Sequence, residues 1–285
     1  MRSRTGANPF SVGDPEETID RIVRFLRTHS ERIGARNLVV GMSGGLDSSV
    51  TAVLCSKALG GKRTMGYFLP EAETRNPRSI RDAEEVAGKF GIRFKSLDIT
   101  DLVQAASSLL HPSRKKESIT PFGNLKARIR ATILYYYANT YRGLVVGTGD
   151  KSEIMLGYFT KYGDGACDIQ PIADMYKSAV RDLARHLGLP RRIFSKPSSP
   201  ELWPGQIAED ELGLPYTKLD SILWRLERWM PPHEISDELK IPVRTVERIR
   251  DRLLHSEHKR RPPVSIKLGF RTAGQDLRIP YSLGL

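Results

Sequence analysis

The fold of this chain is decided by residues 38–49, which read Leu38-Val39-Val40-Gly41-Met42-Ser43-Gly44-Gly45-Leu46-Asp47-Ser48-Ser49. The stretch opens with a short apolar run, which is typical of a buried parallel strand. A loop of glycines and serines follows, and the residues from Val50 to Leu59 have the composition of a helix. A strand, a glycine-rich loop and a helix in this order indicate an α/β fold.

The loop of this unit, Gly41–Ser48, has the features of a phosphate-binding site. Glycines allow the backbone to approach a phosphate closely, and the helix that follows directs its free N–H groups and the positive end of its dipole at the anion. Ser43, Ser48 and Ser49 add hydroxyl donors. Asp47 cannot hold a phosphate by its charge, so its presence indicates a bridging Mg²⁺.

This loop differs from two common nucleotide-binding loops. It is not a Walker A loop, because no Lys follows the glycines, and it lacks the third glycine of the dinucleotide-binding fingerprint. The alternative to a phosphate site is a tight turn in which Asp47 only caps the helix. The complete Ser-Gly-Gly-x-Asp-Ser string at the end of a strand favours the phosphate site.

Strand and helix patterns alternate along the rest of the chain. A helix is predicted to start at Asp14-Pro15, where Asp14 caps and Pro15 suits the first helical position. Further strands are predicted at 64–69, 93–99 and 144–147, and further helices at 77–90, 101–110, 122–141, 176–187, 218–229 and 243–255. Loops are predicted at 111–118 and, rich in glycine and charge, at 159–168.

This alternation predicts an α/β fold with a doubly wound, Rossmann-like parallel sheet and helices on both faces. From about residue 196 the pattern changes to proline, glycine and then helices, which indicates a helical C-terminal appendage. We expect residues 1–13 to be a mobile tail and residues 14–285 to form a single domain.

The composition is that of a soluble globular protein with a basic surplus. Hydrophobic residues make up 39% of the chain, no apolar run is long enough for a membrane span, and the N-terminus lacks a secretory signal. The two cysteines are too few for a thiolate metal site and favour a reducing compartment, so we expect a cytoplasmic protein without a membrane partner. The net charge of +12 fits nucleic acid, any polyanionic ligand including ATP, or a solubilising surface.

Two segments near the middle of the chain add candidate ligands. The string NLKARIR places Lys126 and Arg130 on one helical face and Arg128 elsewhere, and composition alone favours a solvated basic face. Residues 147–153 end a second strand, and ligands bind outside the carboxyl ends of parallel strands, so two such loops can face one site. Glu153 is a candidate second carboxylate for Mg²⁺, or only a helix-start Glu favoured by the dipole.

Later segments carry further charged and aromatic residues. The segment 158–168 reads YFTKYGDGACD, whose aromatics can stack on a pyridine ring and whose aspartates can hold ribose hydroxyls; it equally fits a surface turn. Lys177 opens the next predicted helix, where the dipole disfavours a cation, and this placement indicates a phosphate partner. The basic run His258–Pro263 fits either a clamp on a polyanion or a solvated tail.

The loop string resembles the pyrophosphate loop of the N-type ATP pyrophosphatases, which cleave ATP between the α and β phosphates and adenylate a carbonyl or carboxylate oxygen. Within that group the chain resembles the NAD synthetases from about Thr18 to Pro263. The resemblance is carried, in order, by SGGLDSS, NLKARIR, GTGDKSE, GYFTKYGDGACDIQPI, the Lys177 helix, ELGLPY and HKRRPP. The ordered set is far more specific than any one motif.

The resemblance implies a role for each candidate residue. It implies that ATP is bound by Gly41, Met42, Ser43, Gly44, Gly45, Leu46, Asp47, Ser48, Thr148, Lys177 and Ser199, with Ser198 as the alternative to Ser199. It implies that Lys177 and Asp47 are the catalytic residues and that Asp47 and Glu153 hold Mg²⁺. It implies that the deamido-NAD⁺ site is lined by Arg128, Lys161, Asp164, Asp168, His258 and Lys259.

The resemblance also implies the reaction, which is the ATP-dependent amidation of deamido-NAD⁺ by ammonia to NAD⁺, AMP and pyrophosphate through an adenylated carboxylate. Mg²⁺ is the implied cofactor, and the family forms homodimers. The phosphate loop starts close to the N-terminus, which leaves no room for a glutaminase domain, and neither cysteine stands in a nucleophile-like context. We therefore expect free ammonia, or ammonia from a separate partner, as the nitrogen source.

Two other functions compete with this one. Another adenylating amidotransferase or a tRNA-modifying enzyme would share the loop, but a thiolating enzyme needs paired cysteines, and no RNA-binding module is evident. A DNA-binding regulator is suggested by residues 235–249, which resemble a helix-turn-helix with a basic second helix. NAD synthetases resemble the chain in having a helical segment there, so packing is a sufficient explanation and we expect no nucleic-acid partner.

Overall fold

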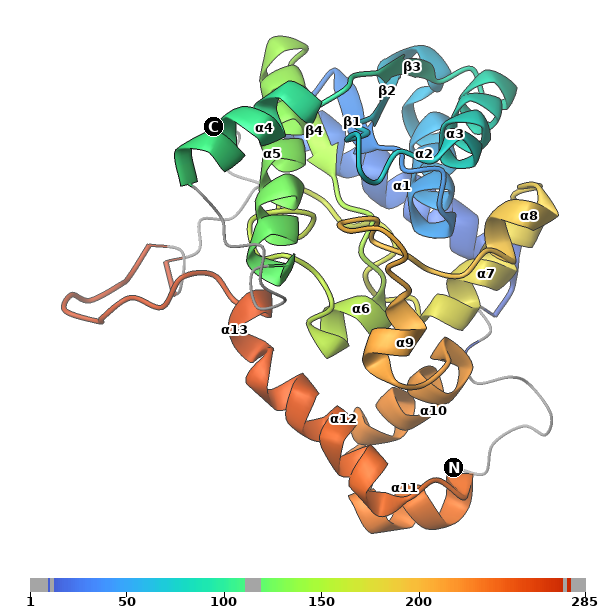
Figure 1. The fold of residues 1–285 in the computed structure, drawn as a ribbon, viewed down its shortest axis with the longest axis vertical. Coiled ribbons are helices and arrows are strands. Elements are labelled where there is room, and N and C mark those ends of the chain that lie inside the picture. The colour runs from blue at the N-terminus through green and yellow to red at the C-terminus, as the bar shows by residue number, and fades with distance from the viewer. Residues whose placement is uncertain (1–9, 11–12, 111–118, 274–275, 278–285) are drawn as a thin grey trace.

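The computed structural model describes residues 10, 13–110, 119–273 and 276–277, and a parallel sheet lies at its centre (Figure 1). In chain order the elements are α1 (Pro15–Ile33), β1 (Asn37–Gly41), α2 (Leu46–Leu59), η1 (Gly61–Arg63), β2 (Thr64–Phe68), α3 (Pro77–Lys89), β3 (Arg93–Ser96), α4 (Thr100–Leu110), α5 (Ile119–Thr140), β4 (Gly143–Val146), α6 (Lys151–Leu156), α7 (Lys177–His186), α8 (Arg191–Phe194), α9 (Ala208–Leu212), α10 (Tyr216–Leu226), α11 (Pro232–Leu239), α12 (Val243–His255) and α13 (Glu257–Arg260). The strands pair in the order β3-β2-β1-β4, and every pair is parallel.

Helices cover both faces of this sheet, as the alternation of strands and helices predicts. Successive residues of a strand point to opposite faces. Leu38 and Val40 of β1 accordingly belong to the core that also contains residues of α1, α2, α3 and α7. Val39, between them, belongs to the core built with α4 and α5. The predicted fold class is confirmed.

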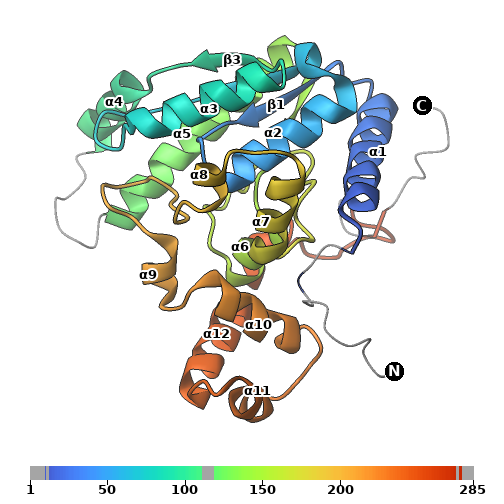
Figure 2. The ribbon, with the colours of Figure 1, turned by 90° about the vertical axis from the view of Figure 1, so that its right-hand side faces the viewer.

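Helices α10, α11 and α12 lie at the end of the molecule away from the sheet (Figure 2). They share a second apolar core, to which Leu156 of α6 and Tyr176, just before α7, also belong. The helical appendage predicted from about residue 196 is therefore joined to the sheet layer through α6 and α7. Across the described ranges, no helix combines the length and the apolar character needed to cross a membrane.

Some predicted boundaries hold and others shift. Asp14 caps α1 as predicted, since its carboxylate accepts the Glu16 N–H at 3.0 Å. The helix expected to begin at Val50 begins at Leu46, because Gly45 already serves as its N-cap, so Asp47 lies in the first helical turn. The strand predicted to reach residue 99 ends at residue 96, and α6 is too short to produce a helical pattern in the sequence. The predicted loop at 111–118 and, apart from residues 10 and 13, the predicted tail lie outside the described residues.

Gly44 shapes the turn between β1 and α2. Its φ of 72° lies in the left-handed region, and an added Cβ would lie 2.0 Å from the carbonyl oxygen of Ser79 in α3. Only a residue without a Cβ fits this position without moving the loop or α3. The Gly41–Ser48 loop is thus packed directly against α3.

We expect Gly44→Ala to lower the free energy of unfolding by more than about 1 kcal/mol, because it adds both a clash and backbone strain. Gly88→Ala is a matched control, since Gly88 lies in α3 and no atom lies within 4 Å of its Cβ position. That control should be neutral or stabilising by up to about 1 kcal/mol. Urea titration of the two variants measures the difference, and equal effects would contradict the packing of the loop on α3.

Candidate active site

A cavity of about 410 Å³ opens at the carboxyl ends of β1 and β4. Its walls are the loop after β1, the loop after β4, part of α5 and the segment 196–206. Ligands of open α/β sheets bind at this edge, and the two glycine loops face one cavity as the sequence predicts. Apart from Gly44, every residue of Gly41–Ser48 lines the cavity, and so do Thr148 and Ser199.

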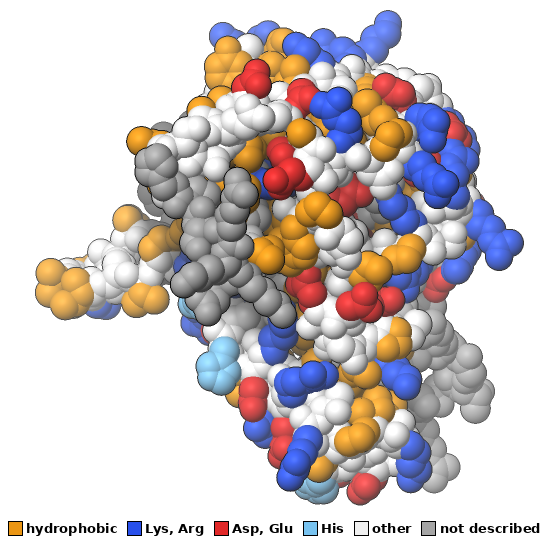
Figure 3. Space-filling view, viewed as in Figure 1, with side chains coloured by type: hydrophobic (Ala, Val, Ile, Leu, Met, Phe, Trp, Pro, Cys, Tyr) orange, Lys and Arg blue, Asp and Glu red, His pale blue; other side chains and the backbone are white. Residues whose placement is uncertain are grey.

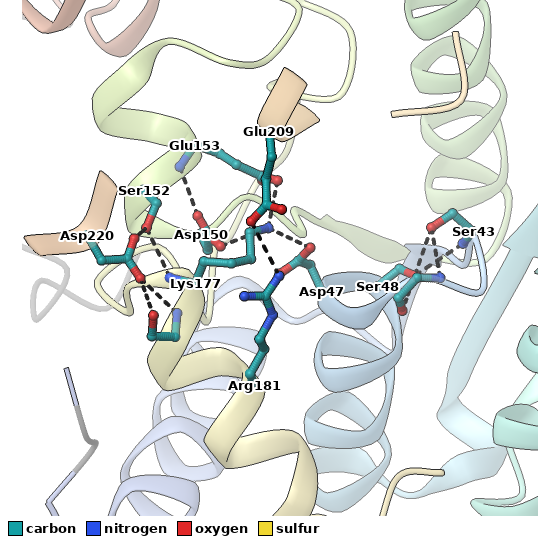
Figure 4. A network of polar contacts seen from close by, with 12 residues as sticks. Ser43, Asp47, Ser48, Asp150, Ser152, Glu153, Lys177, Arg181, Glu209 and Asp220 are labelled. Atoms are coloured by element: carbon teal, nitrogen blue, oxygen red, sulfur yellow. Dashed lines mark hydrogen bonds and ion pairs between the residues drawn. The ribbon is translucent and has the colours of Figure 1, made fainter. Parts of the chain in front are cut away.

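Serine hydroxyls hold the Gly41–Ser48 loop in shape. The Ser43 N–H donates to Ser48 Oγ at 3.2 Å, the two hydroxyl oxygens lie 3.1 Å apart, and the Gly45 N–H donates to Ser43 Oγ at 3.3 Å (Figure 4). Among the described residues no side chain caps α2 at Gly45. The helix therefore presents first-turn N–H groups to an anion in the cavity.

Lys177, the first residue of α7, lies at the centre of the polar network in Figure 4. Its side chain is fully buried, and its Nζ forms ion pairs with Asp47 Oδ2 at 2.8 Å, Asp150 Oδ2 at 2.9 Å and Glu153 Oε1 at 2.7 Å. The centre of the Tyr216 ring lies 5.0 Å from the same nitrogen. Asp47 thus pairs with a cation from a distant helix and does not cap α2.

The three carboxylates outnumber the single ammonium, which leaves an excess of negative charge in a buried place. Burial raises the pKa of both Asp150 and Glu153, and the nearby Lys177 ammonium opposes that rise. Burial by itself would lower the pKa of Lys177, but Asp150, Asp47 and Glu153 hold that pKa well above its ordinary value. Because a buried charge without a partner is costly, the cluster favours one further positive charge, which either a proton on Glu153 or a bound cation supplies.

Asp47 and Glu153 fit a Mg²⁺ site. Both line the cavity, and their side chains keep 18% and 21% of their surface exposed. Asp47 Oδ1 is buried and has no hydrogen-bond partner among the described residues. No group of three or more His, Cys, Asp or Glu side chains in the described chain is arranged to hold a metal by itself. A pair of carboxylates at the cavity suits Mg²⁺, which usually takes one or two carboxylates and completes its shell with water and substrate phosphates.

The residues predicted to bind deamido-NAD⁺ lie in the loop at 159–168 or on α5 and α13 beside it. Lys259 Nζ donates to the carbonyl oxygens of Gly157 at 2.8 Å and Phe159 at 2.7 Å. Lys161 Nζ donates to the carbonyl oxygen of His258 at 2.8 Å, and Arg128 Nε donates to that of Lys161 at 3.3 Å. The structure thus brings α5, the loop and α13 together, although these segments are far apart in the sequence.

Only part of this predicted set meets the main cavity. Asp164 and Lys259 line it, and Lys161 and Lys259 also line a neighbouring hollow of about 320 Å³. The remaining members are exposed and line neither space, and these are Arg128, Asp168 and His258. A dinucleotide in the cavity would therefore need a further surface to bring it to these side chains.

Composition alone favoured a solvated basic face for Lys126 and Arg130 of α5. The structure corrects this interpretation, because the face packs against other elements. Lys126 is 1% exposed and pairs with Glu71 at 2.8 Å and Glu73 at 2.9 Å. Arg130 lines the cavity, its Nε donates to the Leu69 carbonyl oxygen at 3.0 Å, and burial lowers its pKa. Composition could not predict this, because contacts with other elements decide whether a helical face meets water.

Asp150 and Tyr216 also contact Lys177, yet neither is among the residues predicted for the site. Both stand in motifs that carry the resemblance, GTGDKSE and ELGLPY. Asp150 follows β4 in the same loop as Thr148, so its position at a strand end was a usable signal. Nothing local distinguishes Tyr216 from an ordinary core aromatic.

Comparison with known proteins agrees with this geometry. A family model described as NAD synthase matches residues 18–263. The chain is 46% identical to the NH3-dependent NAD⁺ synthetase of Methanocaldococcus jannaschii over 249 residues, which cover 87% of this chain and 95% of that protein. Among solved structures it is similar to the NMN synthetase from Francisella tularensis, with a TM-score of 0.78, 32% identity and coverage of 90% of this chain and 100% of the other. An NH3-dependent NAD synthetase from Campylobacter jejuni matches with a TM-score of 0.75, 27% identity and the same coverage.

Lys177→Met should lower the free energy of unfolding by about 3–5 kcal/mol, because the buried carboxylates lose their counter-charge. Lys151→Met is the control, since Lys151 pairs with Asp174 and Glu227 nearer to solvent, where such pairs contribute about 0–1 kcal/mol. Urea unfolding followed by tryptophan fluorescence gives both values. Similar losses in the two variants would show that the Lys177 network is not the buried cluster described above.

Proposed function

The chain belongs to the NAD synthase family, and on that premise we propose that it is a ligase that amidates deamido-NAD⁺ with ammonia at the expense of ATP. The products are NAD⁺, AMP and pyrophosphate. The observation that carries this proposal is the convergence of the loop after β1 with the first turns of α6 and α7 around Lys177, at the edge of one cavity.

ATP is proposed to lie with its phosphates against the Gly41–Ser48 loop. The N–H groups of the first turn of α2 and the hydroxyls of the loop donate hydrogen bonds to the phosphate oxygens and orient them. Thr148 and Ser199 line the same cavity and contribute further donors. Lys177 offsets the charge of the departing pyrophosphate. Asp47 and Glu153 already form ion pairs with the Lys177 ammonium, so at least one of these carboxylates must turn away when ATP binds.

The chemistry follows from the weakness of a carboxylate as an electrophile. The nicotinate carboxylate attacks the α-phosphorus of ATP, the bond to the bridging oxygen breaks, and pyrophosphate leaves. Ammonia then attacks the acyl carbon and loses a proton, and AMP departs as the acyl C–O bond breaks. The segment 196–206 and the loop at 159–168 wall the cavity and keep water from the adenylate.

Asp47 and Glu153 are proposed to hold Mg²⁺. The unpartnered Asp47 Oδ1 and the excess of carboxylates around Lys177 support this assignment. When bound, the ion neutralises phosphate charge and orients the phosphate oxygens. The role of the protein side chains is to keep these two carboxylates at the rim of the cavity.

The deamido-NAD⁺ site is proposed to comprise Arg128, Lys161, Asp164, Asp168, His258 and Lys259, and to be completed by a second subunit. Three of these residues lie on the surface outside the cavity, which a homodimer would cover. Leu109 on α4 and Tyr136 on α5 are 79% and 65% exposed. An apolar group also stands on the arm that follows α13 (orange at the left of Figure 3), formed by Val264, Ile266, Leu268 and Phe270. Exposed apolar groups of this kind support self-association.

Ammonia is the proposed nitrogen source, because neither cysteine has the character of a nucleophile. Cys55 is fully buried in the core, and burial raises the pKa of its thiol. Burial also raises the pKa of Cys167 to about 11. A glutaminase nucleophile needs a thiolate near neutral pH, so both thiols are unsuited to glutamine hydrolysis.

The remaining expectations belong to the same proposal. Residues 14–285 are proposed to act as one domain, since α10 supplies Tyr216 to the surroundings of Lys177. The cytoplasm is the proposed compartment, supported by the two free cysteines. Lys and Arg side chains are spread over the face in Figure 3 with acidic side chains among them, which does not favour a nucleic-acid surface.

A second candidate is the amidation of the corresponding mononucleotide. The observation that favours it is the similarity to the NMN synthetase from Francisella tularensis, which extends over 90% of this chain. Both substrates present the same nicotinate carboxylate, so the adenylation chemistry is identical. They differ in the adenylyl half, which the cations around the loop at 159–168 are proposed to recognise.

We expect the purified protein to form NAD⁺, AMP and pyrophosphate from deamido-NAD⁺, ATP, Mg²⁺ and ammonium, and to form none with glutamine in place of ammonium. Chromatography of the products with the dinucleotide and with the mononucleotide as alternative substrates measures the preference. Faster turnover of the mononucleotide would select the second candidate. If neither substrate led to AMP release and the protein shifted random duplex DNA at physiological salt, both candidate functions would be contradicted.

Asp47→Ala should abolish turnover and the Mg²⁺-dependent part of ATP binding, because it removes a carboxylate from the cation site. Asp20→Ala is the control, since Asp20 is an exposed carboxylate on α1 far along the chain from the loop. Titration calorimetry with ATP, with and without Mg²⁺, gives a result that does not depend on activity. Retention of Mg²⁺-dependent ATP binding in Asp47→Ala would overturn the metal assignment.

A further inference from the structure

We propose that Asp220 and Tyr216 of α10 are positioning residues that hold Lys177 in place for ATP. This inference rests on the proposed function for the role of Lys177, but its structural part stands on the contacts of α10 alone. The two residues lie one helical turn apart, so both face the start of α7. Neither touches the cavity, and both are fully buried.

Asp220 replaces the cap that α7 lacks. At the start of α7, Tyr176 provides no side-chain hydrogen bond to the helix. Asp220 Oδ2 accepts the Ser178 N–H at 2.9 Å and the Ser178 hydroxyl at 2.6 Å (Figure 4). A carboxylate at a helix N-terminus is stabilised by the free N–H groups and by the helix dipole. A capping group from another helix therefore fixes the first turn of α7, where Lys177 lies.

The same carboxylate also fixes α6. Asp220 Oδ1 accepts the hydroxyl of Ser152 at 2.6 Å, and the oxygen of that hydroxyl accepts the Lys177 N–H at 3.0 Å. Ser152 stands immediately before Glu153, in the first turn of α6. One buried carboxylate thus ties together the turn that carries Glu153 and the turn that carries Lys177. Any movement of Asp220 shifts the ion pair between these two residues.

Tyr216 limits the position of the Lys177 side chain. The ammonium has three N–H donors, and three carboxylates surround it. The aromatic ring adds a cation–π contact, with its centre 5.0 Å from Nζ. The Tyr216 hydroxyl is buried and has no hydrogen-bond partner among the described residues, so the ring and not the hydroxyl carries this role.

The arrangement predicts an effect on the chemical step more than on dinucleotide binding. A flexible lysine stem that loses its anchor misplaces its ammonium, and a displacement of about 1 Å can cost about 100-fold in rate. Asp220→Asn keeps the size of the side chain but loses one of its acceptors. We expect it to lower kcat and the rate of pyrophosphate release by about 10- to 100-fold. The KM for deamido-NAD⁺ should change by less than about twofold, because no dinucleotide residue contacts Asp220.

Three further variants test the parts separately. Tyr216→Phe should keep kcat within about twofold of the wild type, and Tyr216→Leu should lower it, because only the latter removes the ring. The double variant Ser152→Ala with Asp220→Asn should lower kcat by much less than the product of the two single effects. The reason is that both substitutions weaken the same connection between Ser152 and Asp220. Ile222→Val is the matched control, because Ile222 is a fully buried residue of the same helix in the second core and should keep its kcat.

The decisive measurement is kcat per folded enzyme, together with calorimetric binding of Mg²⁺ and ATP in the absence of dinucleotide. Asp220→Asn should bind ATP more weakly than Ile222→Val even when both have the same Tm. Equal kcat and equal ATP binding in these two variants would overturn the positioning role and leave only a structural one.

If Asp220→Asn does not fold, Ser178→Ala removes one hydrogen bond and should lower kcat a few-fold, while an unchanged kcat there would equally overturn the role. If the wild type forms no amidated product, the proposed function fails, and the ATP-binding comparison still decides the positioning.

Discussion

The structure depends on one buried ammonium, that of Lys177. It forms ion pairs with three carboxylates that come from two different strand-to-helix connections, and without it these carboxylates would repel one another in a place with little water. Asp47 belongs to the connection after β1, and Asp150 and Glu153 belong to the one after β4. The ion pairs therefore hold together the two loops that form the cavity. The proposed metal ion and ATP would have to compete with this arrangement.

The same lysine lies between the two apolar cores of the molecule. The helix that carries it, α7, contributes Ala179, Val180 and Leu183 to the core under the sheet. The residue before it, Tyr176, belongs to the core of the C-terminal helices. The predicted helical appendage thus reaches the surroundings of Lys177 through Tyr216 of α10. Through this contact, residues outside the cavity are proposed to position Lys177.

The distribution of charge suits an enzyme that adenylates a dinucleotide. The chain has a net charge of +12, yet the innermost part of the site has more carboxylates than cations. Basic side chains also lie around the loop at 159–168, where Lys161 and Lys259 border the cavity or its neighbouring hollow. An acidic centre of this kind suits the proposed divalent cation, and the basic side chains near it suit the phosphates of the proposed dinucleotide.

Features that depend on neighbours along the chain could be predicted from the residues alone. The start of α1 at its Asp14 cap and the glycine loop ahead of α2 follow from hydrogen bonds and torsion angles among adjacent residues. The parallel sheet follows from the alternation of strand and helix patterns along the chain. The ordered motifs also led to the family and to candidate site residues, of which Thr148, Ser199 and most of Gly41–Ser48 line the cavity.

Only the tertiary structure decided which charges are buried and what they meet. The basic face of Lys126 and Arg130 turned out to be internal, and Asp150 proved to be a third partner of Lys177. Asp220 reaches from α10 to cap a helix that precedes it by many residues. These contacts join segments that are distant in the sequence, and their free energy depends on burial, which no local pattern of residues specifies.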